Sequence, residues 1–120
     1  MSDPPAWPVE IRVDRAERRL EVAFDDGTRF VLPAELLRVE SPSAEVQGHG
    51  PTQKVTVPGK RTVGITAVEP VGNYAVRIVF DDGHDTGIYT WSYLHALGRD
   101  QERLWQAYVA ALAAKGLSRG

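Results

Sequence analysis

Apolar and polar residues alternate in several short stretches of the chain, which is the pattern of half-buried β-strands. Two of the turns between these stretches, at residues 25–27 and 81–83, both read Asp-Asp-Gly, a strong hairpin signal because glycine tolerates a positive φ. The pattern therefore predicts about six strands joined mainly by hairpins, at residues 9–13, 19–24, 28–32, 63–68, 74–80 and 87–89.

Helical signals follow each group of strands. Pro33 is well placed to start a short helix over residues 34–38, and Thr90 can cap a second one over 91–97 that Gly98 ends. Asp100 can cap a longer helix over 101–115, where apolar residues recur at spacings of three and four and form one buried face. The sequence thus predicts an α+β fold, an antiparallel sheet of about six strands with a longer C-terminal helix.

The two halves of the chain also resemble each other. Residues 22–27 align with 78–83, 56 positions apart, and each segment is followed by a return strand and a short helix. We interpret the chain as two strand-turn-strand-helix units. In such a repeat the long loop at 40–61 and the turn at 81–85 lie at related edges of the sheet, where they can face each other.

The domain organisation is simple. Three prolines make residues 1–8 an extended arm, residues 9–115 form one domain, and residues 116–120 are a frayed tail. A chain of 120 residues buries roughly two-thirds of its unfolded surface, so the core needs no disulfide or metal.

Composition excludes several functions. The chain has no cysteine, which rules out disulfides, thiol redox chemistry and cysteine-ligated metals. A net charge of -2, from 14 basic and 16 acidic residues, argues against a nucleic-acid partner. The chain has no secretory signal and no apolar run of about 20 residues, so we expect a cytoplasmic protein with no membrane partner.

Candidate chemistry is concentrated in the loop and the second turn. Asp82, His84 and Asp85 could supply oxygen and nitrogen ligands to a metal, although a solvated hairpin turn explains them as well. His49 follows Glu45 by four positions, a loose general-base arrangement without a nucleophile. No Gly-x-Ser-x-Gly or phosphate-binding loop is present, so we predict no catalytic residues.

Three segments, at residues 37–50, 65–75 and 80–94, together closely resemble the gamma-butyrobetaine hydroxylase-like N-terminal domain family. In eukaryotic members this domain precedes a dioxygenase domain, and related domains are fused to Mrp-type Fe–S cluster carriers. A chain of 120 residues has no room for the dioxygenase's iron-binding jelly roll, so the resemblance does not imply hydroxylase activity.

The resemblance also implies a former metal site. In the hydroxylases three cysteines and one histidine bind zinc, and these positions fall on Ser41, Ser43, Val46 and His84. Serine and valine do not replace cysteine as zinc ligands. We therefore expect Ser41, Ser43 and His84 to lie together in a metal-free hydrogen-bonded cluster. The alternative is that Glu45, His49, Asp82 and Asp85 complete a zinc or iron site with His84.

These observations favour a small non-catalytic module that binds a protein partner, accessory to Fe–S cluster or oxygenase systems and needing no cofactor. A metal-binding protein is the second hypothesis, and a small enzyme the third. Two aromatic residues, Tyr89 and Trp91, either stack on a ligand or pack in the core. The expected binding surface comprises Ser41, Ser43, Glu45, His49, His84, Tyr89 and Trp91.

Overall fold

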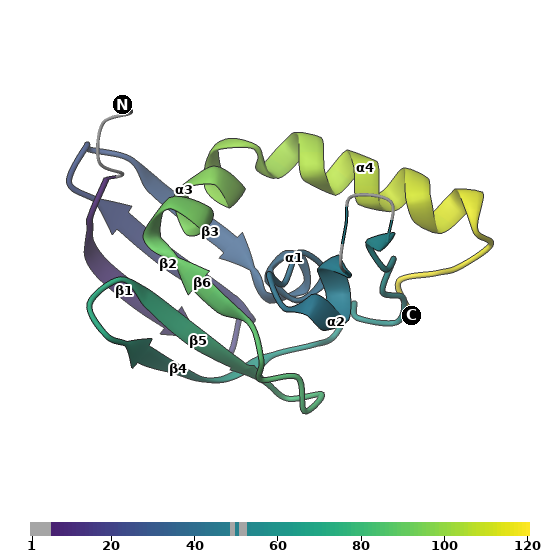
Figure 1. Cartoon of the computed structure of the whole chain (residues 1–120), viewed down its shortest axis with the longest axis horizontal. Helices are drawn as coiled ribbons and strands as arrows, with labels where there is room; N and C mark the ends of the chain where they lie inside the picture. The colour runs from purple at the N-terminus through teal and green to yellow at the C-terminus, as the bar shows by residue number, and fades with distance from the viewer. Residues whose placement is uncertain (1–5, 49, 51–52) are drawn as a thin grey trace.

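In a computed structural model, which describes residues 6–48, 50 and 53–120, the chain forms an α+β domain (Figure 1). Within these residues, six strands form two antiparallel sheets of three, in the orders β1-β2-β3 and β4-β5-β6. The predicted class and strand number are confirmed, with the strands divided between two sheets. The elements are β1 (Pro8–Asp14), β2 (Arg19–Phe24), β3 (Arg29–Pro33), α1 (Ala34–Val39), α2 (Ala44–Gln47), β4 (Ile65–Val71), β5 (Ala75–Phe80), β6 (Ile88–Thr90), α3 (Trp91–Arg99) and α4 (Gln101–Ala114).

The predicted repeat is confirmed by the hydrogen bonds as well as by the order of elements. Each unit is a three-stranded sheet followed by a helix, α1 or α3. The N–H of Gly27 donates to the carbonyl of Phe24 and that of Gly83 to the carbonyl of Phe80, both at 3.1 Å. These glycines have φ values of 88° and 92°, a left-handed conformation that glycine adopts without strain.

The two units exchange contacts through their Asp-Asp-Gly turns. Asp26, in the turn of the first unit, lies 2.9 Å from His95 of α3 in the second unit. Asp82, in the turn of the second unit, lies 2.7 Å from Arg38 of α1 in the first. The second contact holds the end of α1 against the turn after β5. Lys60, in the loop that follows α1, also lies 2.7 Å from Asp82, so the loop and the turn face each other as the repeat predicts.

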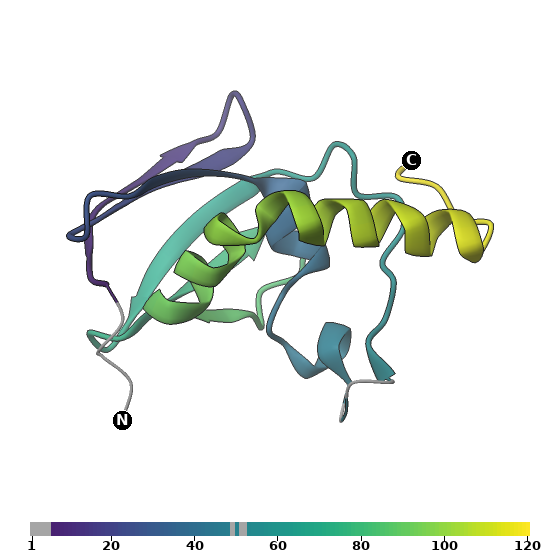
Figure 2. The same ribbon diagram turned by 90° about the horizontal axis from the view of Figure 1, so that it is seen from above.

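One hydrophobic core joins both sheets to the helices. Its buried residues come from β2, β3, α1, Val63 and the start of β4, β5, β6 and α3, with Leu20, Leu32, Leu36, Ile78 and Leu94 among the most deeply buried. Figure 2 shows α3 and α4 following one another along one side of the molecule. Tyr108 and Leu112 of α4 pack with Val39 of α1 in a smaller second cluster.

Three local features differ from the sequence prediction. The long loop contains a short helix, α2, over Ala44–Gln47. β4 continues through Pro70 to Val71, where a turn is predicted, because an edge strand tolerates the missing N–H of proline. α3 continues through Gly98, where a Cβ atom would lie 2.2 Å from Cγ of Phe30, so the glycine permits close packing rather than ending the helix.

The two ends of the chain have different contacts. The predicted arm falls mostly on residues outside the described part, and Pro8 already belongs to β1. At the other end, where a frayed tail is predicted, the carbonyls of Ser118 and Arg119 accept hydrogen bonds from the N–H groups of Gly59 and Arg61. No helix in the described residues is long and apolar enough to cross a membrane.

Candidate functional site

The candidate site is built from two segments that are far apart in the sequence. The first follows α1 and leads into α2, which begins after Ser43, since the Ser43 hydroxyl accepts the N–H of Glu45 at 3.2 Å. The second is the turn after β5, where the N–H of His84 donates to Oδ1 of Asp82 at 3.0 Å. Local capping fixes the backbone of each segment, so that their side chains meet in a defined arrangement.

A line of hydrogen bonds connects Ser41, His84 and Glu45. Oγ of Ser41 lies 2.8 Å from Nε2 of His84, and Nδ1 of His84 lies 3.3 Å from Oε2 of Glu45. Ser41 has no exposed surface and the His84 residue is 7% exposed, whereas the side chain of Glu45 is 61% exposed. The line therefore runs from the interior to the surface.

A second, shallower line connects Ser43, Thr86 and the same glutamate. The hydroxyls of Ser43 and Thr86 are 2.8 Å apart, and Oγ1 of Thr86 donates to Oε1 of Glu45 at 3.0 Å. Because the single hydroxyl proton of Thr86 is used on Glu45, Ser43 must be the donor to Thr86. We call these five residues, Ser41, Ser43, Glu45, His84 and Thr86, the Ser41–His84 cluster.

The charges beside the cluster come from Arg38, Lys60 and Asp82. Nε of Arg38 and Nζ of Lys60 each lie 2.7 Å from Oδ2 of Asp82. Burial alone would raise the pKa of Asp82, but hydrogen bonds from Lys60, the His84 backbone and Arg38 outweigh it and hold this pKa well below its usual range. Asp82 is therefore ionised at neutral pH and ties α1 to the turn.

His84 is neutral in this environment. Burial lowers the pKa of His84, and the positive charge of Arg38 lowers it further, against the opposing effect of Glu45. A neutral ring carries one N–H. Placing the proton on Nδ1 lets it donate to Glu45 and leaves Nε2 to accept the hydroxyl proton of Ser41, so both ring nitrogens are satisfied.

The order serine, histidine, glutamate is also that of a hydrolase triad, in which the histidine activates the serine as a nucleophile. Here the Ser41 hydroxyl is fully buried. A substrate carbonyl cannot reach its Oγ without local opening of the fold. The cluster as it stands is a structural connection between α2 and the turn, made from residue types that elsewhere perform catalysis.

The predicted metal ligands are dispersed or already bonded. Asp82 faces Arg38 and Lys60, Asp85 lies 3.4 Å from Arg77, and His49 is outside the described residues. No group of three or more acidic or histidine side chains in the described part of the chain is placed to hold a metal ion.

The zinc site that the resemblance implies fits the described residues poorly. The corresponding positions offer two hydroxyls, the methyl groups of buried Val46, and His84 with both nitrogens hydrogen-bonded. This set lacks the thiolate ligands that zinc prefers. The metal-binding hypothesis stays a prediction without a ligand set among these residues.

Of the two aromatic residues of the predicted surface, Tyr89 lies beside Ser41 in the interior and Trp91 lies elsewhere. Tyr89 is fully buried, and its hydroxyl donates to the carbonyl of Leu37 at 2.5 Å; burial raises its pKa above the ordinary range. The indole N–H of Trp91 donates to the carbonyl of Asn73 in the β4–β5 turn. Ser41, Ser43, Glu45 and His84 are thus brought together, with Tyr89 packed in the core and Trp91 directed to another turn.

Sequence reasoning missed Arg38, Lys60 and Thr86. A signal for Arg38 was available in the repeat, since Arg38 and His95 are each the fifth residue of their helix and each pairs with the second aspartate of the opposite turn. Lys60 and Thr86 lie in irregular segments without a motif, and only the three-dimensional contacts identify them.

Comparison with known proteins identifies related domains. The family model described as "Gamma-butyrobetaine hydroxylase-like, N-terminal" matches residues 11–95. No curated protein matches the chain.

Three solved structures are similar over most of the chain. Two are NMR solution structures, one with 46% identity over 97% of this chain and 91% of the other, and one with 52% identity over 98% and 87%, each with a TM-score of 0.83. The third is a crystal structure of a protein of unknown function from Acidithiobacillus ferrooxidans that belongs to the DUF971 family, with 44% identity over 81% of this chain and 98% of that one and a TM-score of 0.66.

Proposed function

Because this chain belongs to the gamma-butyrobetaine hydroxylase-like N-terminal domain family, we propose that it is a non-catalytic module that binds a protein partner. The observation that carries the proposal is the burial of the Ser41–His84 pair, with Ser41 at 0% and His84 at 7% exposure. Buried residues of this kind hold the backbone in place. The backbone that they hold carries a preformed surface on α2 and on the turn after β5, where Glu45 and Thr86 are exposed to solvent.

The matching domains support an accessory role. The matching family model is described as "Gamma-butyrobetaine hydroxylase-like, N-terminal", and the Acidithiobacillus ferrooxidans protein is matched over 98% of its length, so it consists almost entirely of this domain. A domain found both ahead of an enzyme and by itself suits a role in bringing proteins together. We propose that this chain serves an oxygenase or an Fe–S cluster system in that way, without cofactor or catalytic residue of its own.

The test uses one isosteric substitution and a matched control. Glu45→Gln removes a surface charge while keeping an oxygen that can accept from His84, and Glu17→Gln makes the same change in the exposed β1–β2 turn. We expect Glu45→Gln to weaken the capture of the partner from lysate by the tagged full-length chain, and Glu17→Gln to leave it unchanged. Equal capture by both variants contradicts the proposed surface.

A second measurement addresses catalysis directly. Hydrolysis of p-nitrophenyl acetate is compared for the unmodified chain and Ser41→Ala. We expect the same slow background rate for both, because the Ser41 hydroxyl has no access to solvent. A rate above background that depends on Ser41 would restore the small-enzyme hypothesis.

A further inference from the structure

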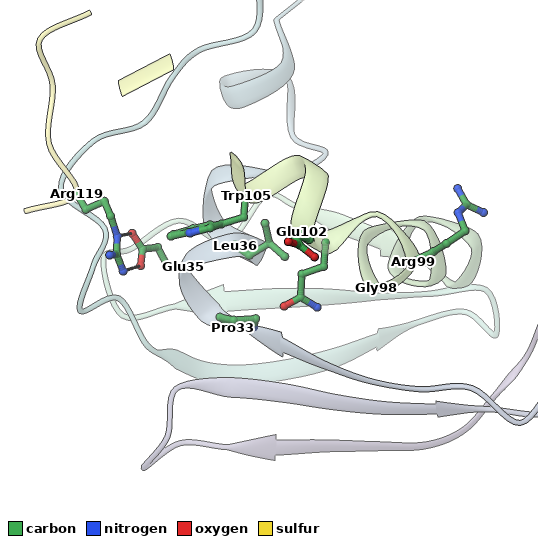
Figure 3. Close-up of a pocket in the computed structure, with 9 residues that line it drawn as sticks. Pro33, Glu35, Leu36, Gly98, Arg99, Glu102, Trp105 and Arg119 are labelled. Carbon is green, nitrogen blue, oxygen red and sulfur yellow. Dashed lines mark hydrogen bonds and ion pairs between the residues drawn. The ribbon is translucent and has the colours of Figure 1, made fainter. Parts of the chain in front are cut away.

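A cavity of about 550 Å³ lies between the start of α1 and the junction of α3 with α4, and none of its lining residues belongs to the Ser41–His84 cluster. Glu35 and Leu36 of α1 form one side, Gly98 and Trp105 of α3 and α4 form another, and Arg119 closes one end (Figure 3). The family comparison and the proposed function assign no role to this cavity.

The cavity contains an arginine-binding arrangement that the chain fills with its own side chain. Arg119 donates to both carboxylate oxygens of Glu35, from Nε at 2.9 Å and from Nη2 at 2.7 Å. Its guanidinium carbon lies 5.0 Å from the centre of the Trp105 ring. A planar guanidinium is thus held by a carboxylate fork and an indole ring, the two groups that bind it best.

Glu35 makes this arrangement specific for a cation. Its side chain is only 7% exposed, and Arg119 is its ion-pair partner. A carboxylate so deeply buried is costly to leave without a positive charge, so an occupant of this position must bring one.

The backbone around Arg119 is bound as well. The N–H groups of Gly59 and Arg61 donate to the carbonyls of Ser118 and Arg119 at 3.0 and 2.9 Å. These two donors lie on an irregular segment and bind the carbonyls of two consecutive residues. Together with the Glu35–Trp105 pair, they hold a segment through its main chain and one arginine.

We propose that this site binds an arginine-bearing segment of a partner protein, and that residues 117–120 occupy it in the absence of the partner. The inference rests on the proposed function, because both treat the domain as a module for a protein partner, and it names the chemistry of that partner at a separate site.

Most of the chain's own segment is exposed, and among residues 117–120 only Arg119 is half-buried. The segment leaves α4 through Gly116, whose φ is 67°, and Leu117 is 39% exposed. The cavity beside Arg119 is bordered by Glu102, which is exposed. This carboxylate suits a second basic residue of an incoming segment, which residues 117–120 lack.

The experiment uses a peptide probe, acetyl-Leu-Ser-Arg-Gly-amide, and its neutral isostere with citrulline in place of arginine. Full-length Arg119→Ala protein labelled with ¹⁵N is titrated with each peptide while the indole N–H signal of Trp105 is followed. We expect the arginine peptide to bind at least about tenfold more tightly than the citrulline peptide. We also expect weaker binding to the unmodified chain, because Arg119 competes for Glu35. Equal binding of the two peptides, or equal affinity for the two proteins, overturns the proposal.

The unmodified chain provides a test that does not depend on the folding of Arg119→Ala. Excess arginine peptide should shift the amide signals of Gly59, Arg61 and Arg119 together, since the peptide takes the place of residues 117–120. If these amide signals stay unchanged at a peptide excess that saturates Arg119→Ala, or at the solubility limit of the peptide, the proposal that the peptide displaces residues 117–120 is overturned.

The readouts separate this inference from the proposed function. If Glu45→Gln weakens partner capture while the peptides are not distinguished, the arginine site is refuted and the binding module stands. If the arginine peptide is selected and Glu45→Gln has no effect, the arginine site is supported and the surface at Glu45 is refuted.

Discussion

The hydrogen bond between Ser41 and His84 predicts a specific loss of stability on Ser41→Ala. The substitution removes a fully buried hydroxyl that lies 2.8 Å from Nε2 of His84 and 3.3 Å from the N–H of Ser43. The imidazole cannot turn to water, because the His84 side chain is only 3% exposed. Leaving a buried polar group unsatisfied costs about 1–3 kcal/mol, so we expect the free energy of unfolding to fall by about 2 kcal/mol.

The measurement is urea unfolding followed by tryptophan fluorescence, with Ser92→Ala as the control. Ser92 is exposed and its hydroxyl lies 3.3 Å from that of Thr90, so its loss should change the free energy of unfolding by less than about 0.5 kcal/mol. We expect a lower midpoint for Ser41→Ala without a change in the slope of the transition.

A double-mutant cycle identifies the cause of the loss. Replacing both partners with apolar groups removes the unsatisfied nitrogen, so His84→Leu should cost at least about 1 kcal/mol less in the Ser41→Ala background than in the unmodified chain. Additive losses, or a loss for Ser41→Ala no larger than for Ser92→Ala, would refute the account of His84 as a buried neutral acceptor.

Three further predictions concern other parts of the structure. Burial lowers the pKa of His84 below 6.5, so just below that pH the unfolded chain binds more protons than the folded chain does. The free energy of unfolding should therefore be constant above about pH 7 and fall as pH decreases below 6.5. Urea titrations should find this pH dependence reduced in His84→Gln, and an unchanged dependence in that variant assigns it to another group. Gly98→Ala should lower the melting temperature despite the better helix propensity of alanine, because the new Cβ would lie 2.2 Å from Cγ of Phe30. Calorimetry should show that the melting temperature partly recovers when Phe30→Ala is combined with Gly98→Ala. An unchanged melting temperature for Gly98→Ala contradicts the close packing of Gly98 on Phe30. Lys54→Met should lower the free energy of unfolding by about 1–3 kcal/mol, because Nζ of Lys54 lies 2.7 and 2.9 Å from the two carboxylate oxygens of buried Glu40. Thermal unfolding should show a smaller loss of stability for Lys54→Met when the chain also carries Glu40→Gln. Equal losses in the two backgrounds exclude a charge effect.

Much of the fold could be predicted because its signals are local. Alternation identified every strand to within a few residues, and the two Asp-Asp-Gly turns identified both the hairpins and the repeat. The exceptions are contacts between distant segments. Gly98 reads as a helix end in the sequence, and only the ring of Phe30 against it shows why glycine is required inside α3.

The site was predicted in the same partial way. The repeat and the family resemblance placed Ser41 and Ser43 near His84, and the structure brings them together. The predicted role of Asp82 and Asp85 as metal ligands depended on their closeness in sequence. In the structure the two carboxylates pair with Arg38 and Arg77, which belong to other strands and helices.

The sequence by itself determined that this protein is a cysteine-free α+β domain made of two similar units, because strand alternation, turn residues and composition are properties of neighbouring positions. Only the tertiary structure decided that the six strands form two sheets, that Ser41 is buried against His84, and that Glu35 and Trp105 hold Arg119. Burial and charge pairing arise between segments tens of residues apart, and their energies depend on which groups the folded chain removes from water.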